Sequence, residues 1–150
     1  MAAGCGLILG LILSALDYME NITGIQLFMI DVFVFVAGMS YCTVMYRDKC
    51  LEGQIGYGTS VLFGILLSAF TFIVIGVYKY IYAVLINPAD YNAQLSQAME
   101  LMREYGYGAS FDDVRRAAGN PMAFTVAYLI NGLLVGVLLA PLISLFIKKK

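Results

Sequence analysis

The chain has 150 residues, of which 61% are hydrophobic and 13% are charged, and its formal net charge is −1. Soluble domains hold about 45–50% apolar and about 25% charged residues, so this composition excludes an ordinary soluble domain and favours a lipid environment. The small net charge provides no basic field for nucleic acid. The absence of His excludes Ser-His-Asp, Cys-His and His-zinc chemistry.

Four apolar runs, at about 2–19, 24–46, 57–86 and 121–147, predict four transmembrane helices. A helix needs roughly 20 residues to cross a bilayer, and backbone groups in lipid must be satisfied within the segment. Asn120 and Pro121 are typical of an N-cap and a first helical position. We therefore predict an all-α fold, an integral membrane four-helix bundle that forms a single transmembrane domain over residues 1–150.

The first and fourth runs each contain two glycines at the spacing of a small-residue packing motif, Gly6 with Gly10 and Gly132 with Gly136. Small residues let helix backbones approach closely in lipid. Two interpretations remain open. The glycines either form the seam of a homo-oligomer, or they pack helices within one bundle.

Two ionisable residues lie inside the second and third runs, Asp31 and Lys79. Each is roughly 10 Å from the outer end of its helix at 1.5 Å per residue, so antiparallel neighbours would place them at one depth. We predict an ion pair that lines a polar, outward-facing cavity. In the alternative interpretation Lys79 extends to the headgroups among Tyr78, Tyr80 and Tyr82, and Asp31 reaches outer water.

The basic residues predict the orientation. Arg47 and Lys49 follow the second run and Lys148–Lys150 follow the fourth, so the positive-inside rule places this loop and both termini in the cytoplasm of a bacterial inner membrane. Arg47 and Lys49 are candidates for contact with anionic lipid or with an acidic surface of a partner. The cysteines also fall at this side, where thiols stay reduced; they are Cys5, Cys42 and Cys50.

The segment 87–119 is predicted to lie outside the cytoplasm. Pro88 can open a helix, and Tyr91, Leu95 and Met99 recur with the period of an amphipathic stripe. Gly106 and Gly108 are expected to end this helix, and the segment Ser110–Asp113 is expected to start a second, short one. We interpret the region as an extracytoplasmic amphipathic helix between the third and fourth spans, lying on the membrane or capping the bundle.

Several motifs together resemble a known family: Tyr46-Arg47-Asp48-Lys49 followed by Gly53-Gln54-Ile55-Gly56-Tyr57-Gly58, the Tyr-rich exit 78–82, the Asn87-Pro88 turn and the basic tail. The pattern is similar to that of the small Bacteroidetes membrane proteins grouped as domain of unknown function 4199. That resemblance implies no activity and no functional residues. It implies a gene neighbourhood with membrane glycosyltransferases of the polyprenyl-phosphate sugar type, and hence a possible partner of that class.

The sequence shows no catalytic constellation, cofactor loop or metal spacing, so we expect no cofactor and no enzymatic activity. Small size and glycine-bearing helices favour a non-enzymatic accessory or scaffold subunit that packs against lipid and another membrane protein. The alternative is a small transporter or channel that uses Asp31 and Lys79 as its polar lining.

Overall fold

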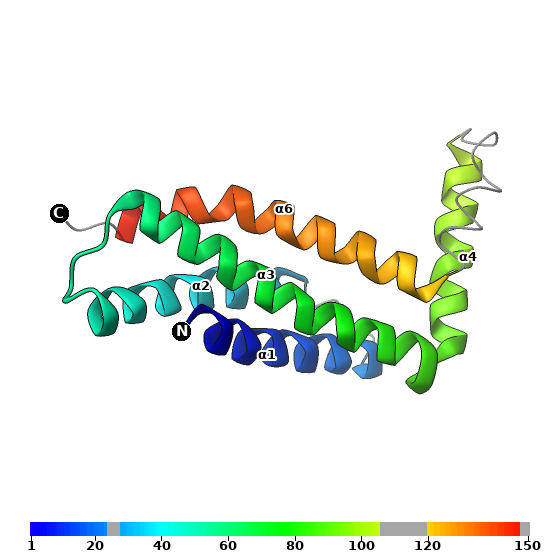
Figure 1. The fold of residues 1–150 in the computed structure, drawn as a ribbon. Coiled ribbons are helices and arrows are strands. Elements are labelled where there is room, and N and C mark those ends of the chain that lie inside the picture. Colours follow the sequence, from blue (N-terminus) through cyan, green and yellow to red (C-terminus); the bar gives the residue numbers. More distant parts are fainter. Residues whose placement is uncertain (24–27, 106–119, 148–150) are drawn as a thin grey trace. The chain divides into compact units, whose positions relative to one another are not determined.

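The structure, a computed structural model, describes residues 1–23, 28–105 and 120–147. In this part of the chain every regular element is a helix, so the predicted all-α class is confirmed. The elements are α1 (Ala2–Thr23), α2 (Phe28–Cys50), α3 (Tyr57–Ile81), η1 (Tyr82–Ile86), α4 (Pro88–Glu104) and α6 (Pro121–Ile147) (Figure 1).

Four helical stretches are long and apolar enough to cross a membrane, as predicted. They are Ala2–Thr23, Met29–Cys50, Tyr57–Ile86 and Leu129–Ile147. The second of these ends later in the chain than the apolar run suggested, because α2 continues through Arg47 and Lys49 to Cys50. Cations are favourable in the last turn of a helix, where the free carbonyl groups carry partial negative charge.

The chain divides into two compact units, one formed by Met1–Ile75 with Leu129–Lys150 and the other by Gly76–Tyr128. We call them unit 1 and unit 2. Unit 1 contains α1, α2, the larger part of α3 and the C-terminal part of α6. Unit 2 contains the end of α3, η1, α4 and the start of α6.

Helix α3 is the central helix of unit 1, because it approaches each of the other three closely. A Cβ atom added to Gly6 of α1 would lie 2.9 Å from the Leu67 carbonyl oxygen of α3. A Cβ added to Gly64 of α3 would lie 2.6 Å from Met39 Cε of α2 and 2.9 Å from Ala140 Cβ of α6. Such distances leave room for hydrogen alone, which is how small residues bring helices together in lipid.

The core of unit 1 contains hydroxyl groups that bond to their own helices. Thr43, Ser68 and Thr71 are at most 1% exposed. Their hydroxyls donate to the carbonyls of Met39, Gly64 and Leu67, one turn earlier, at 2.8, 2.9 and 2.9 Å. A buried hydroxyl without a partner is unfavourable, so this local bond lets a small polar side chain fill the core between close helices.

The start of α1, the end of α2 and the end of α6 lie together at one end of unit 1, which we call the α2–α3 loop end. Cys50 Sγ, in the last turn of α2, is 3.4 Å from Met1 Sδ beside the start of α1. Arg47 Nη1, also in α2, is 3.4 Å from the carbonyl oxygen of Ile147, the last residue of α6. Met1 and Ile147 therefore both lie close to the last turn of α2.

In unit 2 the helix α3 gives way to a turn of π-helix and then to α4. The Asn87 N–H donates to the Tyr82 carbonyl at 2.9 Å, and Asn87 has non-helical φ and ψ of −142° and 73°. A residue before proline is pushed out of the helical region, so the chain turns here and α4 starts at Pro88 as predicted. Helix α4 contacts η1, and Tyr91 is buried, which raises the pKa of its phenol above the ordinary value.

The start of α6 follows the predicted cap. The Asn120 side-chain oxygen accepts a hydrogen bond from the Met122 N–H at 2.9 Å, and Pro121 occupies the first helical position. Helix α6 then continues through Pro141 to Ile147. The predicted ending at Gly106 and Gly108 and the predicted short helix from Ser110 lie outside the described residues. The location of α4 on the outer membrane surface stays a prediction.

Candidate functional site

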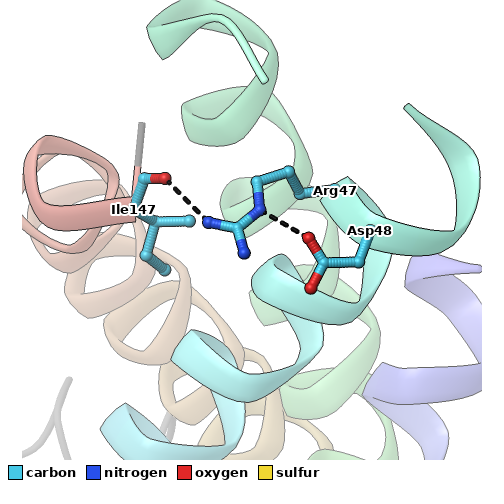
Figure 2. A network of polar contacts seen from close by, with 3 residues as sticks. All are labelled: Arg47, Asp48 and Ile147. Atoms are coloured by element: carbon cyan, nitrogen blue, oxygen red, sulfur yellow. Dashed lines mark hydrogen bonds and ion pairs between the residues drawn. The ribbon is translucent and has the colours of Figure 1, made fainter. Parts of the chain in front are cut away.

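Arg47 is the centre of a polar network at the α2–α3 loop end (Figure 2). Its Nε donates to Asp48 Oδ1 at 2.7 Å, and its Nη1 donates to the Ile147 carbonyl at 3.4 Å. The Arg47 side chain is 15% exposed, against 51% for Asp48. The last carbonyls of a helix have no partner within it, so the guanidinium supplies one to α6 and complements the negative end of its dipole.

The backbone of Arg47 also organises the loop that follows α2. Its carbonyl oxygen accepts the N–H groups of Leu51 and Gly53, both at 3.1 Å. Glu52 and Gly53 then have positive φ angles of 51° and 84°. Glycine often adopts this left-handed conformation directly after a helix. Here the two left-handed residues reverse the direction of the chain.

After this reversal the loop inserts a side chain into the protein. Ile55 is only 2% exposed. In the two helices that flank the loop, the rings of Tyr46 in α2 and Phe63 in α3 stack with centroids 4.3 Å apart and planes 8° apart. The loop between α2 and α3 is therefore held in place by the buried Ile55 side chain and the Arg47 carbonyl, while Tyr57 remains 41% exposed at the start of α3.

The two predicted lipid- or partner-contacting residues differ in their surroundings. Arg47 is engaged with Asp48 and the end of α6. Lys49 is exposed. Contact of either residue with lipid or a partner stays a prediction, and the ammonium of Lys49 is the more accessible of the two charges.

The four predicted packing glycines all face α3. Cβ atoms added to Gly6 and Gly10 would lie 2.9 Å from the Leu67 carbonyl oxygen and 2.8 Å from the Thr71 carbonyl oxygen. Cβ atoms added to Gly132 and Gly136 would overlap the Phe72 ring and Ser68 Cβ respectively. In this structure the glycine faces of α1 and α6 are thus covered by α3 of the same chain.

Sequence reasoning missed the small-residue stripe of α3 on which this packing depends. Ser60, Gly64 and Ser68 recur every fourth residue and are buried. They extend the small-residue motif beyond glycine pairs, so counting serine with glycine would have added α3 to the helices expected to pack closely. The insertion of Ile55 has no such signal, because one apolar residue in a loop is ordinary.

The predicted Asp31–Lys79 pair is divided between the two units. Asp31 lies in the first turn of α2 in unit 1, and Lys79 lies in the last turn of α3 in unit 2. Both side chains have intermediate exposure. The pair and the outward-facing cavity stay predictions.

Among the residues that the structure describes, no group of three or more His, Cys, Asp or Glu side chains is arranged to hold a metal ion. The described residues thus define an all-helical protein with four potential membrane spans, three of which pack on the fourth, α3; this is the architecture of a multi-pass membrane protein.

The family comparison agrees with this class. The family described as protein of unknown function (DUF4199) matches residues 4–149, so the chain belongs to that family. No curated protein and no solved structure matches the chain significantly.

Proposed function

We propose that the chain is a non-enzymatic accessory or scaffold subunit of a bacterial cytoplasmic membrane, and that it packs against another membrane protein. The observation that carries this proposal is the exposed apolar surface of its helices. Phe33 of α2, Leu138 of α6 and Phe146 of α6 are 72%, 69% and 89% exposed. Lipid tails or the helices of a partner would cover such surfaces.

The close packing inside unit 1 favours the scaffold function rather than the channel function. The helices α1, α2 and α6 approach α3 so closely that glycines occupy the contact points. A protein whose central helix is packed on several sides is suited to present fixed outer faces to a partner.

The distribution of charge supports cytoplasmic termini. Arg47 and Lys49 lie at the α2–α3 loop end, and the three lysines of the tail follow α6, which ends there. Asp17 and Glu20 lie in the last two turns of α1, away from its start. The positive-inside rule then orients the loop end towards the cytoplasm.

The partner that we propose is a membrane glycosyltransferase of the polyprenyl-phosphate sugar type. The test is affinity capture of the tagged chain from native membranes, with identification of co-purifying proteins by mass spectrometry. The proposal expects such an enzyme at near-stoichiometric amount with the wild-type chain. If the partner covers the face of Phe33 or of Phe146, the Ala variant of that residue should capture less of the enzyme. The stability of the chain should be unchanged in that variant.

The matched control is Gln54→Ala, which changes an exposed, uncharged residue outside these apolar faces. A chain that is captured with lipid alone, or whose capture of the enzyme is the same for every face variant, contradicts the scaffold proposal.

A transporter or channel is the second candidate, and the observation that favours it is Asp31 within an apolar span. Ionisable residues at membrane depth usually face protein or a water-filled cavity. The test is Asp31→Cys in a chain whose native cysteines are replaced by serine, with a membrane-impermeant maleimide added from outside. Labelling supports an outward-facing cavity, and its absence contradicts one.

A further inference from the structure

Two buried cysteines from different helices face each other in unit 1. Cys5 of α1 and Cys42 of α2 are 7% and 9% exposed. Helices α1 and α2 contact each other, and the two thiols lie within interacting distance across this contact. Both are free thiols, as is the exposed Cys50.

The packing of α1 on α2 determines the position of the Cys5 thiol relative to the Cys42 thiol. One turn further along α1, Leu9 fills the space that a side chain at Gly38 of α2 would need, with its Cδ1 2.5 Å from the added Cβ. Leu9 follows Cys5 by four residues and Gly38 precedes Cys42 by four residues, so the two contacts are successive steps of one antiparallel seam. Gly6 and Gly10 also hold α1 against the backbone of α3. The two thiols are therefore carried by helices that are closely packed.

The chemistry of the pair points to a soft monovalent cation. Thiolates are soft ligands and select Cu⁺ over hard cations such as Mg²⁺ or Ca²⁺. Zinc needs four ligands in a structural site, and the described residues provide no third His, Cys, Asp or Glu beside this pair. Two sulfur ligands from facing helices suit an ion that accepts two-coordinate binding.

We propose that Cys5 and Cys42 bind one Cu⁺ ion as a dithiolate site in the α1–α2 seam. Binding releases one proton from each thiol and forms two copper–sulfur bonds, so the site changes from neutral to a net charge of −1 without oxidation or reduction. Cys5 lies in the first turns of α1, where the helix dipole favours negative charge. The site is independent of the scaffold role, because it needs no partner protein.

The experiment titrates the reduced, full-length chain in detergent with Cu⁺ in competition with a colorimetric Cu⁺ chelator. The wild type should withdraw one equivalent of Cu⁺ per chain. Cys5→Ser and Cys42→Ser should each weaken the affinity at least 100-fold, because one thiolate remains. Cys50→Ser is the matched control, since it removes the exposed thiol of the same chain, and it should bind as the wild type does.

A second measurement uses the wild-type chain and does not depend on the folding of any variant. X-ray absorption at the copper edge should report two sulfur neighbours around the bound ion. The proposal is overturned if the wild type leaves all Cu⁺ with the chelator, if Cys50→Ser removes the binding, or if the ion has mainly nitrogen or oxygen neighbours. It is equally overturned if both Cys5→Ser and Cys42→Ser retain wild-type affinity.

Discussion

Helices α1 and α6 both pack on α3 through a glycine pair, but the glycines meet different parts of α3. Gly6 and Gly10 of α1 face the Cβ atoms of Phe70 and Val74, at 2.6 and 2.7 Å from an added Cβ, and backbone carbonyl oxygens at 2.9 and 2.8 Å. A Cβ atom is attached to the backbone and moves only with it. Gly132 and Gly136 of α6 face side chains, the ring of Phe72 and the hydroxymethyl group of Ser68. A backbone in a helix cannot move alone, whereas a side chain can change its rotamer. The same motif should therefore tolerate substitution differently at the two seams.

The largest effect is expected at Gly10. Gly10→Ala places a methyl group 2.8 Å from the Thr71 carbonyl oxygen and 2.7 Å from Val74 Cβ, so α1 must move away from α3. We expect a loss of roughly 3 kcal/mol in the free energy of unfolding, the upper end of the range for overpacking. The measurement is reversible unfolding in mixed detergent micelles.

Gly4 provides the matched control on the same helix, because a Cβ added there meets nothing within 4 Å. Gly4→Ala should be neutral, or should stabilise the chain by up to about 1 kcal/mol through helix propensity. Equal unfolding free energies for the two variants would show that α1 does not pack on α3 through Gly10.

A smaller effect is expected at Gly136, where the obstacle is the Cβ and Oγ of Ser68. Gly136→Ala should lower the free energy of unfolding by roughly 2 kcal/mol, because Ser68 Cβ is attached directly to the backbone. Adding Ser68→Gly should restore the missing space. The double-mutant cycle should then give a favourable coupling of about 1 kcal/mol or more between the two changes, and strictly additive losses would contradict the contact.

A smaller effect again is expected at Gly132. The atoms that an added Cβ would meet belong to the Phe72 ring, which also packs against Phe35 with centroids 5.3 Å apart. Gly132→Ala should lower the free energy of unfolding by about 1 kcal/mol, since rotation of the ring relieves most of the overlap. Fluorine NMR of fluorophenylalanine at position 72 would detect the ring movement. A loss as large as that of Gly10→Ala would remove the distinction between the two seams.

The smallest effect is expected where α6 is held by a polar contact rather than by glycine. Arg47→Gln removes the charged donor to the Ile147 carbonyl and to Asp48. The Tm should fall by less than it does in Gly132→Ala, because ion pairs near the surface contribute little. Lys49→Gln, at an exposed position, is the control and should leave the Tm unchanged. A larger fall in Tm than that of Gly132→Ala would contradict this prediction, because Arg47 would then contribute more than Gly132 to holding α6 in place.

The sequence predicted the helices far better than it predicted their arrangement. Apolar length and the Asn120-Pro121 and Asn87-Pro88 pairs indicate where helices lie and begin, because these signals are local. The partner of a glycine face is not local. Gly6 and Gly10 indicate a close approach, but only the contacts of their added Cβ atoms in the structure identify α3 as the helix that approaches.

The candidate site shows the same limit. Basic residues at the end of an apolar run predict a membrane orientation, and the sequence identified Arg47 on that ground. Its bond to the Ile147 carbonyl joins residues a hundred positions apart, and a backbone acceptor has no residue type to reveal it. Cys5 and Cys42 likewise have no recognisable spacing, since their proximity follows from the antiparallel packing of α1 on α2.

The most direct test of the account asks whether α2 crosses the membrane. In a chain with Cys5 and Cys42 changed to serine, the native Cys50 reports the α2–α3 loop end. In a second variant Cys50 is also changed to serine and Glu20 is changed to cysteine. The new thiol reports the end of α1 that lies away from the α2–α3 loop end. Right-side-out and inside-out vesicles are treated with a membrane-impermeant maleimide. The account predicts that the two thiols react in opposite vesicle preparations, with Cys50 labelled in the inside-out one. Labelling of both from one side would contradict it.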